Sequence, residues 1–366
     1  MVSGIWPPDV GGPASHAPEV ADFLHERGHT VEVVTTAWTP PEQRAYRVSA
    51  VPRGLPPGVR HLRGAALIQR RALDADAVYT TGMFGRSFAG ATAARKPYVV
   101  KLTADPAFER ARRRGIVGGD VDAFQGRSGA RLTLLRLARD LELRRASRVF
   151  CPSEYLRELV ISWGIPAARV SVLPNPAPRV GDLPPRDELR DSFDMNGDTL
   201  AFAGRIGAQK SLEVAFAAVD AVDGVSLLVA GDGEERARLE ALAGPRVRFL
   251  GPQARERVLE LFRAADASLL SSSWENFPHT VVESLAVGTP VLATRVGGVA
   301  EVVQDGENGL LVESGDVDAL AGAIRRYFGD EALRARLRAN AAESVRAYDR
   351  EVVFAGIEQA LADAIA

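Results

Sequence analysis

Short apolar runs alternate with amphipathic stretches along most of the chain. Apolar runs bounded by glycine, proline and polar residues predict buried strands, and apolar positions spaced three and four apart predict helices. In the first half, strands are predicted at Thr30–Thr35, Ala77–Thr80, Tyr98–Leu102, Arg148–Cys151 and Val170–Leu173, and helices at His16–Arg27, Ala130–Ala146 and Glu154–Trp163. In the second half, strands are predicted at Leu200–Ala203, Ser226–Ala230, Val247–Leu250, Ala267–Leu270, Val291–Ala293 and Leu310–Val312, with helices between them. This alternation predicts an α/β protein with parallel sheets.

A proline-rich stretch from Leu173 to Pro185 interrupts the pattern. Prolines there oppose helix and central strand, so the stretch predicts a linker. A length of 366 residues also exceeds what one hydrophobic core usually holds. We therefore expect two domains and a terminal helix, with boundaries at 1–174 (first domain), 175–185 (linker), 186–349 (second domain) and 350–366 (C-terminal helix).

The beginning of the chain departs from this pattern. An α/β domain of this kind is expected to open with a strand of about five residues. Here only Met1-Val-Ser precede Gly4, and a loop follows at once. A central strand lost from a sheet would leave unpaired backbone groups. We therefore expect that the first strand is missing or that the true start lies upstream.

Composition narrows the class of protein. Apolar content of 46% and charged content of 25% are typical of a globular protein. No apolar run approaches the roughly 20 residues of a membrane span, and no basic and apolar leader begins the chain. The single cysteine, Cys151, fits a reducing compartment and is expected to be a buried thiol. The expected location is the cytoplasm.

Charge is distributed unevenly between the two halves. Residues 1–174 carry a net charge of +9 and residues 175–366 carry −11. A basic first domain, with runs such as Arg110-Ala-Arg-Arg-Arg114, suits an anionic acceptor or peripheral contact with an anionic membrane face. Solvated helix faces explain the same arginines equally well. Nucleic acid is not expected as a partner, since no zinc, homeodomain or aromatic stacking motif accompanies them.

The stretch Glu275-Asn-Phe-Pro-His-Thr-Val-Val-Glu283 follows a predicted strand, and Pro278 opens a helix within it. Ligands of parallel sheets bind outside the carboxyl ends of the strands. Paired carboxylates at that edge suit sugar and ribose hydroxyls, which donate hydrogen bonds to charged acceptors. The alternative is an acidic helix start that only stabilises the helix dipole.

Two further segments suggest phosphate binding. A strand ends at Gly204, and Arg205 and Lys210 bracket the loop before the next helix, which is typical of a diphosphate site. Only three of the 45 basic residues are lysines, which draws attention to Lys210. In the first loop, Gly11 and Gly12 precede a helix, where glycine lets the backbone approach a phosphate.

These residues together resemble those of the family 4 glycosyltransferases, the large retaining group with GT-B architecture. The resemblance rests on the first-loop glycines, the Arg205 and Lys210 pair, the two glutamates, and the tail from Gly288 to Gly298. It implies two Rossmann-like domains that face each other across a cleft, with the C-terminal helix crossing back to the first. It further implies a donor site for a nucleoside-diphosphate sugar, formed by Gly204, Gly251, Glu275, Asn276, Phe277, Pro278 and Glu283.

The resemblance also assigns roles within that site. Glu275 and the backbone of Asn276 and Phe277 hold sugar hydroxyls, Glu283 holds the ribose diol, and the loop at Gly251 lies near the base. The implied mechanism retains anomeric configuration, and the leaving phosphate takes the acceptor proton. No Asp-x-Asp or histidine cluster suggests a metal ion, so Arg205 and Lys210 are expected to meet the diphosphate charge without metal or cofactor.

One place departs from the family pattern. Many members carry a histidine after the fourth or fifth strand of the first domain, but here the chain reads Val99-Val-Lys-Leu-Thr-Ala-Asp105. Lys101 or Asp105 is therefore expected at the acceptor pocket, with Asp105 among the catalytic candidates. Asp105 alternatively caps a turn before Pro106. His16 is a further acceptor-side candidate, or else an exposed or capping residue.

The expected reaction is transfer of a hexose from a UDP- or GDP-linked donor to a glycan or lipid-linked acceptor, in cell-envelope, polysaccharide or glycolipid synthesis. A sugar-nucleotide epimerase of the same two-domain plan remains the nearest alternative. A dinucleotide oxidoreductase is disfavoured, because Gly4 to Gly12 does not fit Gly-x-Gly-x-x-Gly. The sequence leaves the nucleotide, the sugar, the acceptor and the oligomeric state open.

Overall fold

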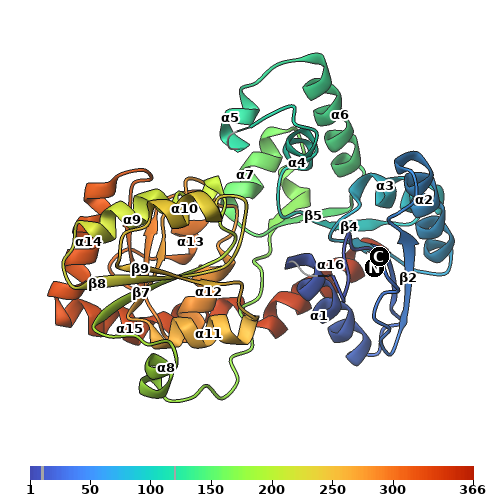
Figure 1. The fold of residues 1–366 in the computed structure, drawn as a ribbon. Helices are drawn as coiled ribbons and strands as arrows, with labels where there is room; N and C mark the ends of the chain where they lie inside the picture. The colour runs from blue at the N-terminus through green and yellow to red at the C-terminus, as the bar shows by residue number, and fades with distance from the viewer. Residues whose placement is uncertain (10–11, 119–120) are drawn as a thin grey trace. The chain divides into compact units, whose positions relative to one another are not determined.

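A computed structural model of the chain describes residues 1–9, 12–118 and 121–366. The chain divides into two compact units, Met1–Pro174 together with Glu351–Ala366, and Asn175–Arg350. Each unit has a parallel sheet with helices on its faces (Figure 1). The predicted fold class is confirmed, with two Rossmann-like units and a C-terminal helix, α16 (Arg350–Ile365), that from Glu351 on belongs to the first.

The first unit alternates strands and helices as predicted. Its elements before α16 are α1 (Gly12–Glu26), β1 (Glu32–Ala37), β2 (Arg47–Pro52), α2 (Pro57–Leu73), β3 (Val78–Thr80), α3 (Phe84–Ala93), β4 (Tyr98–Lys101), α4 (Pro106–Arg113), α5 (Val121–Gln125), α6 (Ala130–Arg144), β5 (Arg148–Cys151), α7 (Glu154–Ser162), the 3-10 turn η1 (Ala167–Arg169) and β6 (Val170–Val172). The sequence analysis predicted no helix or strand where the structure has strand β2 and helices α2 to α5.

Residues Met1–Ser3 hold the position where the first strand was expected. Val2 forms parallel bridges to Val34 of β1 and Thr80 of β3, and so joins the pair β1–β2 to the run β3–β4–β5–β6. The amide of Val2 donates to Tyr79 O at 2.8 Å, and the amide of Ser3 donates to Val34 O at 3.0 Å. The backbone groups at this central position are therefore paired, although the pairing is limited to these few residues.

The core of the first unit includes the last helix. Val353, Phe354 and Ile357 of α16 are buried in one cluster with Val20 and Phe23 of α1. The rings of Phe23 and Phe354 meet edge to face, with centroids 5.5 Å apart. Burial of such side chains contributes roughly 1.5–3 kcal/mol each, so α16 is a structural part of this unit.

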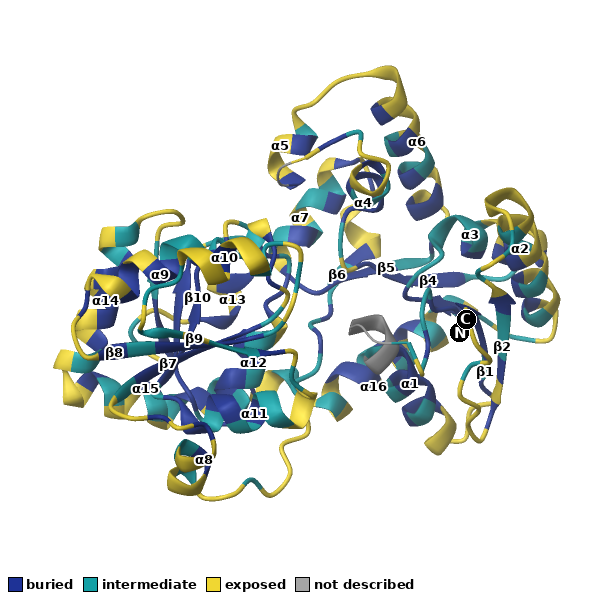
Figure 2. Ribbon diagram, viewed as in Figure 1, coloured by how far each residue is buried: buried dark blue, intermediate teal, exposed yellow. Residues whose placement is uncertain are grey.

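The second unit consists of α8 (Arg186–Ser192), β7 (Asp198–Ala203), η2 (Ala208–Lys210), α9 (Leu212–Asp220), β8 (Val225–Ala230), α10 (Arg236–Leu242), β9 (Val247–Gly251), α11 (Arg255–Ala264), β10 (Ala267–Leu270), α12 (His279–Ala286), β11 (Val291–Thr294), α13 (Val299–Val302), β12 (Gly309–Val312), α14 (Val317–Gly329), α15 (Glu331–Ser344) and η3 (Arg346–Tyr348). Its parallel strands lie in the order β12-β11-β10-β7-β8-β9. Figure 2 shows the strands of this sheet as largely buried and the outer faces of its helices as exposed. Helices cover both faces of a parallel sheet, which explains the continuous apolar runs in its strands.

Candidate active site

Neighbouring strands β7 and β10 of the second sheet lead into the loops that carry the predicted donor residues. The two strands pair in parallel through Ala267 with Leu200 and Ser268 with Ala201. Their carboxyl ends therefore lie at the same edge. The loop after β7 contains Lys210, and the loop after β10 contains Glu275. Topology thus brings together two residues that are far apart in the sequence.

Lys210 and Glu275 form an ion pair at this edge. Lys210 Nζ donates to Glu275 Oε1, and the two side chains are 17% and 8% exposed. The hydroxyl of Ser272 donates to the same oxygen at 2.7 Å. Because the pair is shielded from water, its attraction exceeds that of an exposed ion pair. Both of these contacts fall on Oε1, and no donor among the described residues occupies Oε2 of Glu275.

Several hydrogen bonds fix the two loops against each other. Gln209 Nε2 donates to Trp274 O at 2.6 Å, and Ser271 Oγ donates to Lys210 O at 2.8 Å. From β11, Thr294 Oγ1 donates to Ser272 O at 2.6 Å. These bonds hold the backbone on both sides of the ion pair, so the two charged groups are positioned before any ligand binds.

The loop after β8 packs backbone to backbone against the loop after β7. A Cβ on Gly231 would lie 1.9 Å from Gly204 O, and a Cβ on Gly233 would lie 2.2 Å from Ile206 O. The amide of Ile206 donates to Asp232 O at 2.9 Å. Only glycine fits at 231 and 233, and the sequence analysis overlooked both. The detectable signal was Gly-Asp-Gly placed directly after a buried strand.

Gly204 and Gly251 lie at the carboxyl ends of β7 and β9. Gly251 has a φ of +71°, which favours glycine, and its carbonyl accepts from the amide of Gly231 at 2.8 Å. The loops after β7, β8 and β9 are thus joined through their backbones. This arrangement places Gly251 at the same edge of the sheet as the Lys210 and Glu275 pair.

Arg205 lies in a different setting from Lys210. Its side chain is 64% exposed, and Nη2 lies 3.0 Å from Glu234 Oε2. An exposed pair of this kind contributes about 0–1 kcal/mol and exchanges readily for another anion. Arg205 thus stays accessible beside the β7 loop, whereas Lys210 is held by Glu275.

Helix α12 carries Glu283 five residues after its N-cap, Pro278. The Glu283 side chain is 15% exposed, and its Oε1 lies 3.3 Å from Arg255 Nε. Burial raises the pKa of this carboxyl, and the Arg255 charge opposes that rise. Just before the helix, Phe277 is buried and meets the His279 ring edge to face, with centroids 5.6 Å apart. Glu275 O accepts from the amide of Gly298 at 3.2 Å, which ties this segment to the start of α13.

Asp105 has a structural role, and the expectation of a catalytic acceptor-side carboxylate there is corrected. Asp105 is fully buried and caps α4, with Oδ1 accepting from the amides of Ala107 and Phe108 at 2.8 and 3.3 Å. Oδ2 accepts from Arg139 Nη1 at 2.9 Å and from Gln125 Nε2 at 3.0 Å. Both oxygens are occupied inside the domain, as the turn-capping alternative requires.

Lys101 is likewise buried. Its Nζ donates to Leu173 O and, at 3.3 Å, to Pro174 O, at the point where the chain leaves the first unit. Burial lowers the pKa of Lys101 to about 7. Burial also raises the pKa of the Cys151 thiol to about 12, as expected for a buried structural cysteine. Lys101 therefore supports the end of β6, and the expectation of an acceptor-pocket lysine is corrected.

The other residues of the first unit that were predicted to bind donor or acceptor are Gly11, Gly12 and His16. Gly11 lies outside the described residues, and Gly12 is the first residue of α1. The His16 ring, farther along α1, meets Phe354 of α16 edge to face, with centroids 5.8 Å apart. His16 therefore takes part in the packing between α1 and α16.

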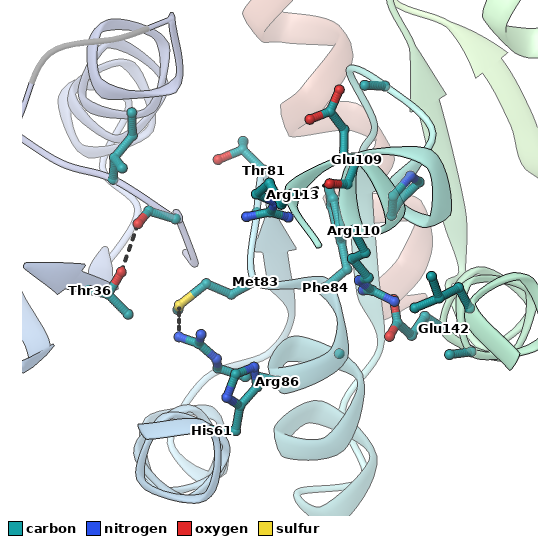
Figure 3. A pocket seen from close by; sticks show the side chains of 18 of the residues that line it. Thr36, His61, Thr81, Met83, Phe84, Arg86, Glu109, Arg110, Arg113 and Glu142 are labelled. Atoms are coloured by element: carbon teal, nitrogen blue, oxygen red, sulfur yellow. Dashed lines mark hydrogen bonds and ion pairs between the residues drawn. The ribbon is translucent and has the colours of Figure 1, made fainter. Parts of the chain in front are cut away.

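The first unit contains a cavity of about 1030 Å³ that sequence reasoning missed. It lies at the carboxyl ends of the strands, where Gly4, Thr81 and Thr103 follow Met1–Ser3, β3 and β4. Figure 3 shows Thr81 among the side chains that line it. Ligands of parallel sheets bind at this edge. Six arginines and two glutamates line it, which makes it basic: Arg53, Arg60, Arg86, Arg110, Arg113, Arg114, Glu109 and Glu142.

Two features are not found among the residues that the structure describes. No helix among them is both long enough and apolar enough to cross a membrane. In the same part of the chain, no three histidine, cysteine or acidic side chains gather as a metal ion would need.

Solved structures with the same architecture identify the fold as GT-B. The protein HepE from Anabaena, solved with UDP-glucose, is 21% identical, and its match covers 99% of each chain at a TM-score of 0.77. Sucrose-phosphate synthase from Thermosynechococcus elongatus is 20% identical, with 99% of this chain and 98% of that chain covered at a TM-score of 0.80.

Sequence relatives identify the family. Residues 186–344 match the family described as Glycosyl transferases group 1, and residues 10–178 match Glycosyltransferase Family 4. A D-inositol 3-phosphate glycosyltransferase of Xylanimonas cellulosilytica is 30% identical, with 93% of this chain and 88% of that relative covered. The chain belongs to the family 4 glycosyltransferases, as the sequence resemblance predicted.

Other relatives match over a smaller part of their length. The lipopolysaccharide core biosynthesis glycosyltransferase LpsE of Rhizobium meliloti is 36% identical, with 52% of this chain and 62% of that relative covered. A D-inositol 3-phosphate glycosyltransferase of Acidothermus cellulolyticus is 32% identical, with 57% and 51% covered. The matched segment thus spans between half and two thirds of these two relatives.

The structural role of Asp105 predicts a loss of stability when its partner is removed. Arg139→Met should lower the free energy of unfolding by about 3–5 kcal/mol, because it leaves a buried carboxylate without its counterion. Urea denaturation followed by circular dichroism measures this change. Arg131→Met, at an exposed position on the same helix, is the matched control and should stay near wild type. A stable Asp105→Asn protein that has lost turnover would contradict the structural role.

Proposed function

We propose that the protein is a retaining glycosyltransferase that moves a hexose from a UDP- or GDP-linked donor to an acceptor hydroxyl. The observation that carries this proposal is the shielded Lys210 and Glu275 pair at the carboxyl edge of the second sheet. A cation for the diphosphate and a carboxylate for sugar hydroxyls stand side by side there, with Glu283 on the next helix. Family membership supports the same reading.

In this proposal, the donor lies along the loops after β7, β8 and β9. Arg205 and Lys210 bind the diphosphate, and the Lys210 ammonium stabilises the charge that develops on the leaving phosphate. Oε2 of Glu275 accepts from a sugar hydroxyl, and Asn276 and Phe277 contribute their backbone. Glu283 holds the ribose diol, and Gly251 lies near the base. The leaving phosphate takes the acceptor proton on the face of the sugar that it vacates, which retains configuration.

The names of relatives support a role in cell-envelope, polysaccharide or glycolipid synthesis. LpsE is named for lipopolysaccharide core biosynthesis. A relative from Mycobacterium tuberculosis, 28% identical over 336 residues, is named a GDP-mannose-dependent alpha-mannosyltransferase. HepE was solved with UDP-glucose. We propose a glycan or lipid-linked acceptor that enters the first unit.

We also propose peripheral contact with the inner face of the cytoplasmic membrane. Leu134, Leu137 and Leu141 recur on one side of α6 and are 68%, 60% and 59% exposed. Exposed arginines 112–114 end the neighbouring helix α4, and each basic residue near anionic lipid contributes about 1 kcal/mol. Sedimentation with phosphatidylglycerol vesicles tests the contact. Equal recovery in the supernatant with anionic and neutral vesicles would contradict it.

The diphosphate assignment predicts a binding defect for Lys210→Ala. Loss of a charge-assisted hydrogen bond should raise the dissociation constant of the nucleoside diphosphate about ten- to a hundredfold. Titration calorimetry with UDP and GDP measures it. The same change at another lysine, Lys96→Ala in the first unit, is the control and should leave affinity unchanged. Wild-type affinity in Lys210→Ala would remove Lys210 from the site.

Substitutions of Glu283 and Glu275 should have different effects on the steady-state kinetics. Glu283 holds a part of the donor that does not react, so Glu283→Gln should mainly raise KM. Glu275 holds the sugar that becomes oxocarbenium-like, so Glu275→Gln should lower kcat more than it raises KM. Exposed Glu331→Gln is the control, and melting temperatures establish that each variant is folded. The reverse pattern would mean that the two roles are exchanged.

Transfer is expected to proceed without a divalent ion and with retention. In excess EDTA, turnover should persist, because Arg205 and Lys210 supply the positive charge at the diphosphate. Proton NMR of the product should show the anomeric configuration of the donor. Turnover that disappears in EDTA and returns with Mg²⁺ or Mn²⁺ would contradict the assignment. An epimerised sugar formed without acceptor would indicate an epimerase instead.

A further inference from the structure

The arginines that line the first-unit cavity differ in their partners. Arg53 is paired with Asp9 at 2.7 Å, and Arg110 is paired with Glu142 at 2.7 Å. Within the described part of the chain, no carboxylate pairs with Arg86. Its Nη1 donates only to the weak acceptor Sδ of Met83, at 2.9 Å (Figure 3). Arg86 therefore brings an uncompensated charge to the cavity.

Arg60 stands close to Arg86 and is also without an acidic partner among the described residues. It comes from α2, whereas Arg86 comes from the neighbouring helix α3. Arg60 Nη1 donates to Arg53 O at 2.9 Å, and its buried Nε has no acceptor in the described structure. Burial lowers the pKa of Arg86, and the nearby charge of Arg60 lowers it further. Two half-buried like charges repel, and an oxyanion between them would relieve that repulsion.

The backbone of α2 makes room for the Arg86 side chain. A Cβ on Gly64 would lie 2.7 Å from Arg86 Cδ, closer than real side chains approach. The stem of Arg86 therefore crosses α2 at Gly64. A glycine inside a helix costs about 1 kcal/mol relative to alanine. At Gly64 the helix bears this cost, and the missing side chain leaves the space through which the Arg86 side chain passes.

Other polar groups reach the same cavity. Thr81 lines it, and its buried Oγ1 has no partner among the described residues. His61 lines the cavity beside Arg86, with Nδ1 2.5 Å from Pro57 O (Figure 3). A hydroxyl and an imidazole next to two guanidinium groups suit a ligand that carries both an anionic group and hydroxyls.

We propose that Arg60 and Arg86 bind an oxyanion, a phosphate or a carboxylate, carried by the acceptor glycan. The inference rests on the proposed transferase function, because it assumes that the acceptor enters this cavity. Guanidinium forks match phosphate and carboxylate oxygens in pairs of hydrogen bonds, so the two side chains select an acidic acceptor over a neutral one. The chemical class of the acceptor is thus an acidic or phosphorylated sugar.

Calorimetry with UDP saturating the donor site tests the proposal, with glucose, glucose 6-phosphate and glucuronate as probes. At least one anionic probe should bind more tightly than glucose, and the better one identifies the oxyanion. Arg86→Gln and Arg60→Gln should each weaken that binding about ten- to a hundredfold. Arg70→Gln, an exposed arginine on α2, is the control and should leave it unchanged.

Gly64→Ala provides an independent variant. It removes no charge and favours the helix, yet its methyl group must displace the Arg86 stem, so anion affinity should again fall about tenfold or more. The proposal is overturned if neither anionic probe binds wild type better than glucose. Equal losses in Arg70→Gln and Arg86→Gln, or full affinity in Arg86→Gln or Gly64→Ala, also overturn it.

Failure of this proposal is distinguishable from failure of the proposed function. UDP affinity reports on the second unit and should be unchanged in Arg86→Gln and Gly64→Ala. Normal UDP binding without anion selectivity removes the oxyanion subsite and leaves the transferase proposal intact. If the wild-type protein binds neither UDP nor GDP, the result counts against the transferase proposal. In that case, titration with the sugar probes alone still shows whether the oxyanion subsite exists.

Discussion

The contact between Lys210 and Glu275 organises the proposed donor site. The two side chains come from loops after neighbouring parallel strands, and hydrogen bonds from Ser271 and Gln209 hold those loops together. A partly buried ammonium and carboxylate stabilise one another only while both stay in place. In the proposed function, the pair therefore keeps a charge for the diphosphate and a carboxylate for the sugar hydroxyls in position.

At the same edge of the second sheet, the loops after β7 and β8 pack backbone against backbone. Gly231 and Gly233 allow the β8 loop to lie against the β7 loop, where any side chain would collide with Gly204 O or Ile206 O. The two units use this edge differently. The second presents a compensated ion pair, and the first presents a basic cavity in which Arg60 and Arg86 lack acidic partners among the described residues.

Much of the fold and part of the site could be predicted from sequence. Buried parallel strands are nearly continuous apolar runs, so the strands of the second sheet were placed within a few residues. The helical pattern of the last residues placed α16 equally well. Short motifs marked Lys210, Glu275 and Glu283. Strand β2 was missed because it is short and exposed at both ends, and helix α2 was missed because four arginines and a histidine interrupt its apolar positions. Asp105 and Lys101 were wrongly assigned to a pocket. Their burial depends on contacts with Arg139 and with Leu173, and no local sequence pattern shows that these residues lie nearby. Among the cavity arginines, the run from Arg110 to Arg114 was noted for its charge, but Arg60 and Arg86 escaped notice for the same reason.

The most direct test is a crystal structure of the protein with a nucleoside-diphosphate sugar that it turns over. Lys210 Nζ should contact the diphosphate, Glu275 should accept from a hydroxyl of the transferred sugar, and Glu283 should contact the ribose. A nucleotide bound elsewhere, with the Lys210 and Glu275 pair untouched by ligand, would contradict these assignments.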